Sequence, residues 1–311
     1  MPRTRTIRIG TRSSPMALHQ AGQVAAALEA QDPVVTTELV KITTSGDQWM
    51  GDLAALGGKG AFVREIDRAL LEGGVDLAVH CLKDIPGDVP TPEGLTFAAY
   101  LQRENIHDAV ISRTGAPLGE LPAGALIGTS SVRRAAQLHL HHPHLRVKPL
   151  RGNVNTRLMR LEEGHFDAII AAVSGLYRVE QADRITEILS LETMCPAIGA
   201  GIIVLQCRAG DDEIQTRTAR LGDEETTRHA IAERAMLHAL QGHCNSPIAG
   251  YATTEPSGKL TLRGKVFNLD GSQWLDSHHW GVPEDPAALG FFVGADLLRQ
   301  GARALIDSIT H

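Results

Sequence analysis

A basic segment stands out in a chain that is acidic overall. Residues 128–160 contain no aspartate or glutamate, while the whole chain of 311 residues has a net charge of -6 at pH 7. The basic residues of the segment are Arg133, Arg134, Arg146, Lys148, Arg151, Arg157 and Arg160. Thr129 and Ser131 precede one predicted helix, and Gly152 and Asn153 precede the next. Arginines, hydroxyl groups and helix N-termini bind carboxylates and phosphates. The segment therefore predicts a site for a polyanionic small ligand, with a solvated basic surface as the alternative.

Two further segments have residues suited to acid–base or nucleophilic chemistry. Lys83 and Asp84 directly follow a predicted buried strand, and ligands of open α/β sheets bind at the carboxyl ends of strands. The pair is either a structural ion pair or an acid–base couple with altered pKa values. Cys244 follows Gly242, which suits the end of a helix, and a loop thiol near basic groups can act as a nucleophile. An incidental free cysteine is the alternative, and Cys81 is a second candidate thiol.

Two other patterns are less specific. The loop Gly57-Gly58-Lys59-Gly60 precedes a predicted helix and favours anion binding, although it lacks the Ser or Thr that follows lysine in a P-loop. A flexible turn is the alternative. Four histidines at 139, 141, 142 and 144 lie where a helix runs into a turn, which favours a surface connection over a metal site. The four cysteines form no paired ligand motif, so no zinc site is predicted.

Composition and charge exclude several classes of protein. Apolar residues make up 43% of the chain and charged residues 21%, which excludes a disordered chain or a coiled-coil rod. The acidic net charge and an aromatic content of 4% argue against nucleic-acid binding. No stretch approaches the ~18 apolar residues of a membrane span, and the N-terminus has no apolar signal region. Well-separated cysteines suit free thiols, so a cytoplasmic protein is expected.

Hydrophobic periodicity predicts two α/β units followed by a smaller α+β unit. The first unit has strands separated by helices, which implies a parallel sheet with right-handed crossovers, at 7–10, 34–42 and 75–80. The second has strands at 108–112, 126–129, 145–150 and 167–173 and helices at 131–140 and 153–163. The last has a helix near 232–240, antiparallel strands at 248–253, 259–267 and 274–279, and a closing helix at 286–306.

Taken in order along the chain, these motifs resemble the hydroxymethylbilane synthase family, also called the porphobilinogen deaminases. The matching segments are 11–15 (TRSSP), 57–60 (GGKG), 80–86 (HCLKDIP), 128–134 (GTSSVRR), 151–157 (RGNVNTR), 232–235 (AERA) and 242–244 (GHC). Each motif is short, but all of them in this order form a specific pattern that covers nearly the whole chain.

The resemblance implies a fold class and a domain division. It implies two α/β domains like the halves of a periplasmic binding protein around a cleft, and a small C-terminal α+β domain. The expected domains are 1–103 with 200–221, then 104–199, and then 222–311, which carries the loop cysteine. The chain would cross between the first two domains near Arg103 and near 199–201.

The implied activity is that of a transferase in tetrapyrrole (porphyrin and haem) biosynthesis. Four porphobilinogen units are condensed head to tail onto a covalent dipyrromethane cofactor with release of ammonia, and hydrolysis then releases linear hydroxymethylbilane. The resemblance implies that a thioether joins the cofactor to Cys244 and that no metal or nucleotide is needed. It also implies a monomer whose product passes to uroporphyrinogen-III synthase.

The resemblance also implies roles for individual residues. Asp84 is the expected catalytic group, because a fixed carboxylate stabilises positive charge on the pyrrole after ammonia leaves and can move a proton. The expected cofactor-binding residues are Cys244, Lys83, Arg133, Arg134, Ser13, Thr129, Ser131 and Lys59. The expected residues for substrate carboxylates are Arg12, Arg151, Arg157 and Arg178.

The chain departs from the family pattern at Ala55, Cys81, Ala200, Gln206 and His243. These departures leave the aspartate and the loop cysteine intact but bear on elongation and interdomain hinging. A related enzyme of a specialised tetrapyrrole pathway is therefore one alternative. A non-catalytic two-lobed solute-binding protein is a second, which the missing signal region disfavours. A nucleic-acid-binding protein that uses the basic segment is a third, which the few aromatic residues disfavour.

Overall fold

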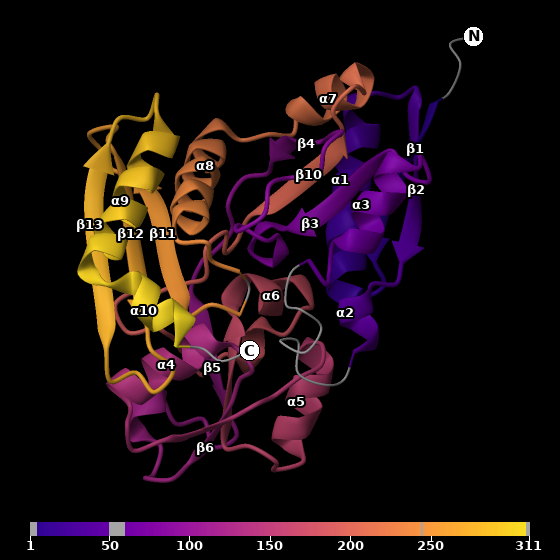
Figure 1. The fold of residues 1–311 in the computed structure, drawn as a ribbon. Coiled ribbons are helices and arrows are strands. Elements are labelled where there is room, and N and C mark those ends of the chain that lie inside the picture. The colour runs from indigo at the N-terminus through magenta and orange to yellow at the C-terminus, as the bar shows by residue number, and fades with distance from the viewer. Residues whose placement is uncertain (1–4, 50–59, 244, 309–311) are drawn as a thin grey trace.

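The computed structural model describes residues 5–49, 60–243 and 245–308, which form three sheets (Figure 1). The first sheet has five strands in the order β2-β1-β3-β10-β4. Their bounds are β1 Arg5–Arg12, β2 Val35–Ile42, β3 Leu77–Cys81, β4 Leu95–Tyr100 and β10 Ile203–Arg208. β1 pairs in parallel with β2 and β3, which confirms the predicted parallel unit. β10 comes from much later in the chain and runs antiparallel to β3 and β4.

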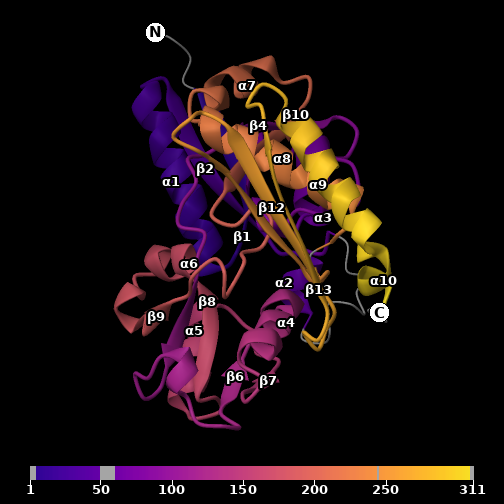
Figure 2. The ribbon, with the colours of Figure 1, turned by 90° about the vertical axis from the view of Figure 1, so that its left-hand side faces the viewer.

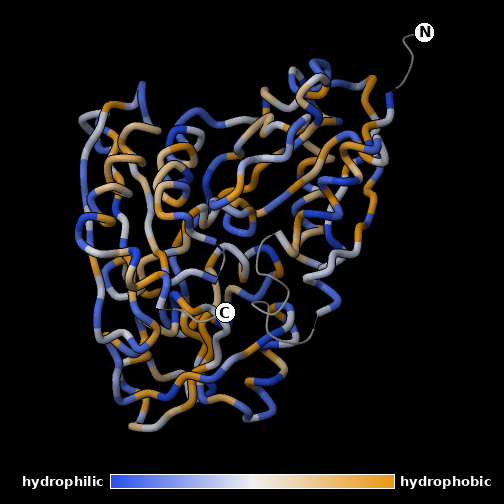
Figure 3. The backbone as a smooth tube through the Cα atoms, in the orientation of Figure 1, coloured by the Kyte–Doolittle hydropathy of each residue, from blue (hydrophilic) through white to orange (hydrophobic). Residues whose placement is uncertain are grey.

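Both faces of the first sheet are covered by helices. Successive strand residues point to opposite faces, so Leu77 shares a core cluster with Val24 of α1 (Pro15–Gln31). Ala78 lies in a different cluster with Ile66 of α3 (Arg64–Leu71). Hydrophobic residues run along these strands in Figure 3. The other helical elements of this unit are α2 (Ser45–Gln48), η2 (Leu82–Asp84) and α7 (Asp212–Ala219).

The second sheet also has five strands, in the order β7-β6-β8-β5-β9. Their bounds are β5 Asp108–Ser112, β6 Leu126–Gly128, β7 Arg146–Lys148, β8 Ala168–Ala172 and β9 Glu187–Ile188. β6 is parallel to β7 and β8, whereas β5 is antiparallel to β8 and β9. Val110 packs with Leu138 of α4 (Val132–His141), and Ala109 packs with Leu158 of α5 (Val154–Glu162). These two helices therefore cover opposite faces of the sheet.

The C-terminal unit is the predicted α+β unit. Its antiparallel strands are β11 (Ile248–Thr254), β12 (Leu260–Phe267) and β13 (Trp274–Gly281). Helices α8 (Glu224–Ala239) and α9 (Pro286–Gln300) lie against one face of this sheet (Figures 1 and 2). Met236, Leu262 and Val293 join the three elements in one core cluster. Within the described residues, no helix has the length and apolar character needed to cross a membrane.

Two local predictions about helix ends are wrong in detail. The closing helix is interrupted at Gly301, whose φ of 106° lies in the left-handed region, and α10 (Ala302–Asp307) follows it. After α8, the left-handed residue is Gln241 (φ 50°) rather than Gly242. Gly242 is needed for space instead, because a Cβ there would lie 2.5 Å from Ile248 and from Leu237.

Two segments that connect the first and second sheets run side by side. The Leu101 backbone N–H donates to the Ile203 carbonyl at 2.9 Å, and the Glu104 N–H donates to the Gly201 carbonyl at 2.9 Å. Gly201 has a φ of 75°, and a Cβ there would lie 2.4 Å from the Glu104 carbonyl oxygen. Arg103 donates from Nε to the Ala200 carbonyl at 2.9 Å. Because this last bond uses the backbone of Ala200, it does not depend on the side chain at that position.

A buried glutamate of the C-terminal unit ties these connecting segments to α8 and β11. Glu233 is fully buried and accepts a hydrogen bond from Arg103 Nη1 at 2.7 Å. It also accepts from the backbone N–H groups of Gly199 at 2.7 Å and Ala252 at 2.8 Å. The three units are thus joined through one carboxylate at the point where the chain crosses between the two larger sheets.

Candidate active site

The carboxyl ends of β1 and β3 place Arg12 close to Asp84. One guanidinium nitrogen of Arg12 lies 3.8 Å from Asp84 Oδ2. Arg12 Nε also donates to Asp47 Oδ1 at 3.1 Å, and the Phe62 ring lies 4.2 Å from the guanidinium carbon. Burial acts to lower the pKa of Arg12, but the Asp47 hydrogen bond and the charge of Asp84 together raise it. Arg12 therefore remains a fixed positive charge beside the Asp84 carboxylate.

Asp84 is fixed by the short helix η2 that follows β3. The Leu82 N–H donates to the Ile202 carbonyl at 2.9 Å, and the Ile85 N–H donates back to the Leu82 carbonyl at 3.1 Å. Leu82 is buried, whereas the Asp84 side chain is 35% exposed. Lys83 is half-buried between them. The predicted Lys83–Asp84 position at a strand end is confirmed, and the turn leaves the Asp84 carboxylate accessible.

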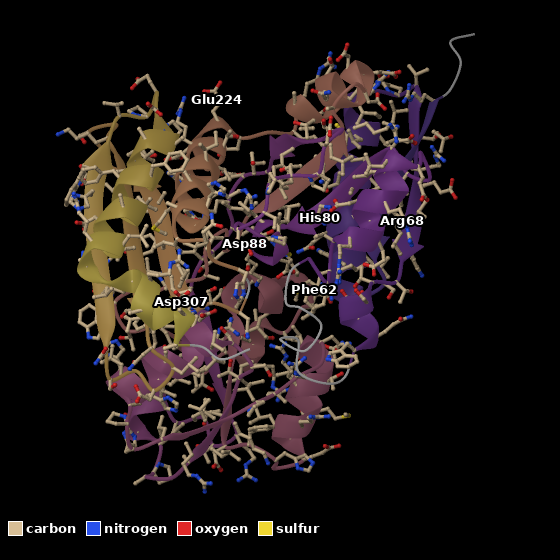
Figure 4. The ribbon with its side chains drawn as sticks, in the orientation of Figure 1. Phe62, Arg68, His80, Asp88, Glu224 and Asp307 are labelled. Carbon is tan, nitrogen blue, oxygen red and sulfur yellow. The ribbon has the colours of Figure 1, made fainter. Side chains whose placement is uncertain are left out.

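A buried neutral histidine lies behind this turn. Figure 4 shows His80 on β3, and its Nε2 lies 2.9 Å from Gln206 Oε1 on β10. Burial, opposed by the Gln206 hydrogen bond and by Asp84, lowers the pKa of His80 to about 4. His80 is therefore uncharged near neutral pH. Next to it, the Cys81 Sγ accepts a hydrogen bond from Gln20 Nε2 at 3.2 Å.

On the second sheet, Arg157 lies near two other arginines. Asn153 caps α5 by accepting the Thr156 N–H, and Arg157 Nε donates to the Gly152 carbonyl at 2.8 Å. Burial and the charges of Arg134 and Arg151 lower the pKa of Arg157 to about 10. Within the described part of the chain, Arg157 pairs with no carboxylate. The result is a partly buried positive site that favours an anion.

Arg133 and Arg134, in contrast, share a buried carboxylate. Asp108 Oδ2 lies 2.7 Å from Arg133 Nη2, and Oδ1 lies 2.5 Å from Arg134 Nη2. All three side chains are buried. Burial alone would raise the pKa of Asp108, but Arg134 and Arg133 hold it well below its usual range. Arg134 also donates to the Ile170 carbonyl, and Arg133 donates to the Cys195 carbonyl. That these two arginines bind ligand carboxylates stays a prediction.

Removing the Asp108 charge is expected to destabilise the protein. An Asp108→Asn variant leaves two buried guanidinium groups without their counter-ion, and breaking a buried pair costs about 3–5 kcal/mol. Urea unfolding followed by circular dichroism measures the change in the free energy of unfolding. Asp307→Asn is the control, because the Arg303–Asp307 pair is exposed and is expected to contribute less than about 1 kcal/mol. Equal stability of the two variants would contradict a structural role for the buried pair.

Four other predicted site residues lie at three separate places in the structure: before α4, just after β1, and at the end of α6. Thr129 accepts the Ser131 N–H at 3.2 Å, and Ser131 accepts the Arg134 N–H at 3.4 Å as the N-cap of α4, so both hydroxyls take part in capping. Ser13 is exposed just after β1. Arg178 lies at the end of α6 (Val173–Arg178), and its Nη2 is 2.9 Å from Glu104 Oε1.

Several sequence predictions fall on residues that the structure does not describe or does not bring together. Lys59, Cys244 and Ala55 lie outside the described residues. Among the described residues, no three or more histidine, cysteine, aspartate or glutamate side chains form a group that could hold a metal ion. The two charged groups described above, around Arg12 and around Arg157, belong to different sheets. α1 and α6 bring those sheets into contact. The Met16 side chain of α1 lies so close to Gly175 of α6 that a Cβ added to Gly175 would be 3.0 Å from Met16 Cε.

Sequence reasoning missed the acidic partners of the arginines. Asp47, Asp108 and Glu104 come from segments distant in sequence from the residues they bind. Only Asp47 has a local signal, because Thr44 and Asp47 form a capping box at the start of α2. That signal predicts a helix start but does not reveal the pairing with Arg12.

Comparisons with known proteins agree over the whole chain. A family model described as the porphobilinogen deaminase dipyromethane cofactor binding domain matches residues 7–216, and one for the porphobilinogen deaminase C-terminal domain matches residues 227–299. "Porphobilinogen deaminase 2" of Streptomyces coelicolor is 55% identical over 98% of this chain and 97% of its own length. A porphobilinogen deaminase of Acidithiobacillus ferrooxidans is 45% identical over 98% of this chain and 99% of its own.

Solved structures with similar folds are more distant. The methionine binding protein MetQ has a TM-score of 0.44 at 12% identity, covering 70% of this chain and 89% of its own. An ancestral cationic amino acid solute binding protein has a TM-score of 0.43 at 16% identity, covering 70% of this chain and 87% of its own.

Fold and site together define a class of protein: two mixed α/β units with an arginine–carboxylate pair on one and a group of neighbouring arginines on the other, together with a small α+β unit. Within that class, the chain belongs to the porphobilinogen deaminase family, as the family models and the full-length relatives show. The predicted family, its transferase activity in tetrapyrrole biosynthesis and its dipyrromethane cofactor are thereby confirmed.

Proposed function

We propose that this chain condenses porphobilinogen into linear hydroxymethylbilane with Asp84 as its catalytic group. The observation that carries the proposal is the placement of Asp84 in an accessible turn at the end of β3, with Arg12 at 3.8 Å. This is the edge at which sheets of this kind present residues to ligands. Family membership favours the enzyme over a solute-binding protein.

The described residues fit a polycarboxylate cofactor such as dipyrromethane. Arg157 is partly buried beside two more arginines, a donor set that favours carboxylates. We propose that Arg151 and Arg157 bind carboxylates of the substrate and the growing product, together with Arg12 and Arg178. Lys83, Arg133, Arg134, Ser13, Thr129, Ser131 and Lys59 are proposed to hold the cofactor, with Cys244 as its point of attachment. When bound, the cofactor supplies the nucleophilic pyrrole carbon to which porphobilinogen is joined.

Asp84 has two tasks in the proposed reaction. Release of ammonia breaks the carbon–nitrogen bond of the aminomethyl group, and the bonding electron pair leaves with ammonia. Positive charge then lies on the porphobilinogen pyrrole, where a fixed carboxylate stabilises it. When the new carbon–carbon bond forms, a proton must leave the attacked pyrrole, and the Asp84 carboxylate is the group placed to accept it. Arg12 orients this carboxylate.

The proposed domain division follows the packing of the three sheets. Residues 1–103 and 200–221 form the first domain, a division supported by the pairing of β10 with β3 and β4. Residues 104–199 form the second domain, and residues 222–311 form the third. The antiparallel connecting segments near Arg103 and 199–201 are the proposed crossings. Glu233 holds both of them, so it positions the crossings relative to the third domain.

Replacing Arg157 tests the proposed anion site. Loss of a hydrogen bond to a charged group costs about 1.5–3 kcal/mol, so Arg157→Ala is expected to lower kcat/KM for porphobilinogen about 10–100-fold. Arg146→Ala is the matched control, because Arg146 belongs to the same basic segment but is exposed on β7. Steady-state assays of both variants measure the difference. Equal kcat/KM in the two variants would remove Arg157 from the proposed site.

The remaining parts of the sequence prediction also stand as proposals. We propose a monomeric enzyme of the cytoplasm that uses porphobilinogen and passes its product to uroporphyrinogen-III synthase. The support for these points is the family to which the chain belongs.

A further inference from the structure

A pocket lies against the segment that directly follows Asp84. It has a volume of about 250 Å³, equal to the liquid volume of about eight water molecules. Its walls come from α3, from the 85–92 segment, from β4 and β10, and from α8 of the C-terminal unit. In Figure 4, Asp88 marks the 85–92 segment as it passes between β3 and α8. The pocket therefore lies at the junction of the first and third units.

Most of the pocket wall is apolar. Val63, Ile85 and Pro86 line it together with the Phe97 ring. The Arg234 guanidinium lies 5.2 Å from the centre of that ring and donates to the Pro86 carbonyl at 3.3 Å. The apolar wall around the Phe97 ring, next to this guanidinium group, suits the apolar body of a small aromatic ligand.

One wall of the pocket has a carboxylate that is short of hydrogen-bond donors. Asp67 of α3 lines the pocket, and its Oδ1 is buried without a hydrogen-bond partner among the described residues. Burial raises the pKa of Asp67, and the Gln206 side chain acts in the opposite direction. A buried acceptor without a donor costs free energy. A ligand that donates to Asp67 recovers this cost on binding.

The opposite charge is present at the rim. Arg64 is exposed and lines the same pocket, as does Arg234. Neither arginine belongs to the segments that carry the proposed active-site residues. The pocket thus offers one buried acceptor, an apolar wall and positive groups at its edge.

From this arrangement we infer that the pocket binds a small aromatic ligand that bears an ammonium group and a carboxylate. The ammonium group donates to Asp67, the ring packs against the apolar wall around Phe97, and the carboxylate pairs with Arg64. Ile85 and Pro86 directly follow Asp84, so an occupant contacts the segment that fixes the catalytic turn. It also contacts α8, and it therefore strengthens the junction between the first and third units.

The probe is 4-(aminomethyl)benzoate, titrated into the holoenzyme by isothermal calorimetry. Asp67→Asn preserves size and removes the charge, and is expected to weaken binding at least tenfold. Val89→Trp places a bulky side chain at the exposed rim of the pocket and is expected to abolish binding without disturbing the core. Val282→Trp is its control, because Val282 is also an exposed valine but lies after β13, in the C-terminal unit. It should bind as the wild type does.

Two comparisons make the result decisive. In the wild type, 4-methylbenzoate lacks the ammonium group and should bind at least tenfold more weakly, whereas in Asp67→Asn the two probes should bind alike. Arg12→Lys alters the proposed active site and should leave binding intact. Unchanged affinity in both Asp67→Asn and Val89→Trp would overturn the inference. So would loss of binding in Arg12→Lys with retention in Val89→Trp, or failure of the probe to bind the wild type.

Discussion

Asp84→Asn is expected to slow the turnover of porphobilinogen by about 10²–10³-fold, the effect of removing one electrostatic stabiliser. Asparagine has nearly the size of aspartate, so the turn at η2 and its bonds to Ile202 and Leu82 should remain. It has neither the negative charge that stabilises the pyrrole cation nor the basicity to accept a proton. Arg12 would also lose the carboxylate that lies 3.8 Å from it.

Asp84→Glu separates charge from geometry. Glutamate keeps the charge but extends the carboxylate by one methylene group, so this variant should retain activity between those of the wild type and Asp84→Asn. Single-turnover formation of enzyme-bound pyrrole intermediates measures the chemical step, and circular dichroism checks the fold. Turnover by Asp84→Asn within a few-fold of the wild type would exclude Asp84 as the catalytic group.

Local sequence patterns predicted most of the elements because their signals are local. The apolar run before His80 predicted β3, and the alternation at 248–253 predicted β11. β10 was missed although its apolar run Ile203–Leu205 is typical of a buried strand. Its place in the first sheet has no local signal, because the chain returns there only after it has passed through the second sheet. The strand β4 was missed as well, since its sequence has no alternation, and three of its six residues are alanine or threonine.

The charged pairs show where sequence reasoning ends. The basic segment was expected to bind a ligand as a whole. In the structure, Arg133 and Arg134 pair with Asp108, which lies 25 and 26 residues away, whereas Arg157 pairs with no carboxylate among the described residues. Residue type and spacing do not distinguish these two situations. Only the fold shows which arginines already have a counter-ion and which part of the segment has positive charge available to a ligand.

The attachment of dipyrromethane to Cys244 has the largest expected effect of any single change. Cys244→Ala removes the only thiol proposed to form the thioether, so this variant should contain no cofactor and should not form hydroxymethylbilane. Cys81→Ser is the matched control. The Cys81 thiol contacts Gln20 at the end of β3 and has no role in attachment in this account, so the variant should retain the cofactor.

The intact mass of the protein purified from cells that make porphobilinogen tests this account most directly. The wild type and Cys81→Ser are predicted to be heavier than their sequences by one dipyrromethane unit, and Cys244→Ala is predicted to have the mass of its sequence alone. Wild-type protein without the added mass, or a Cys244→Ala variant that still carries it, would contradict the account.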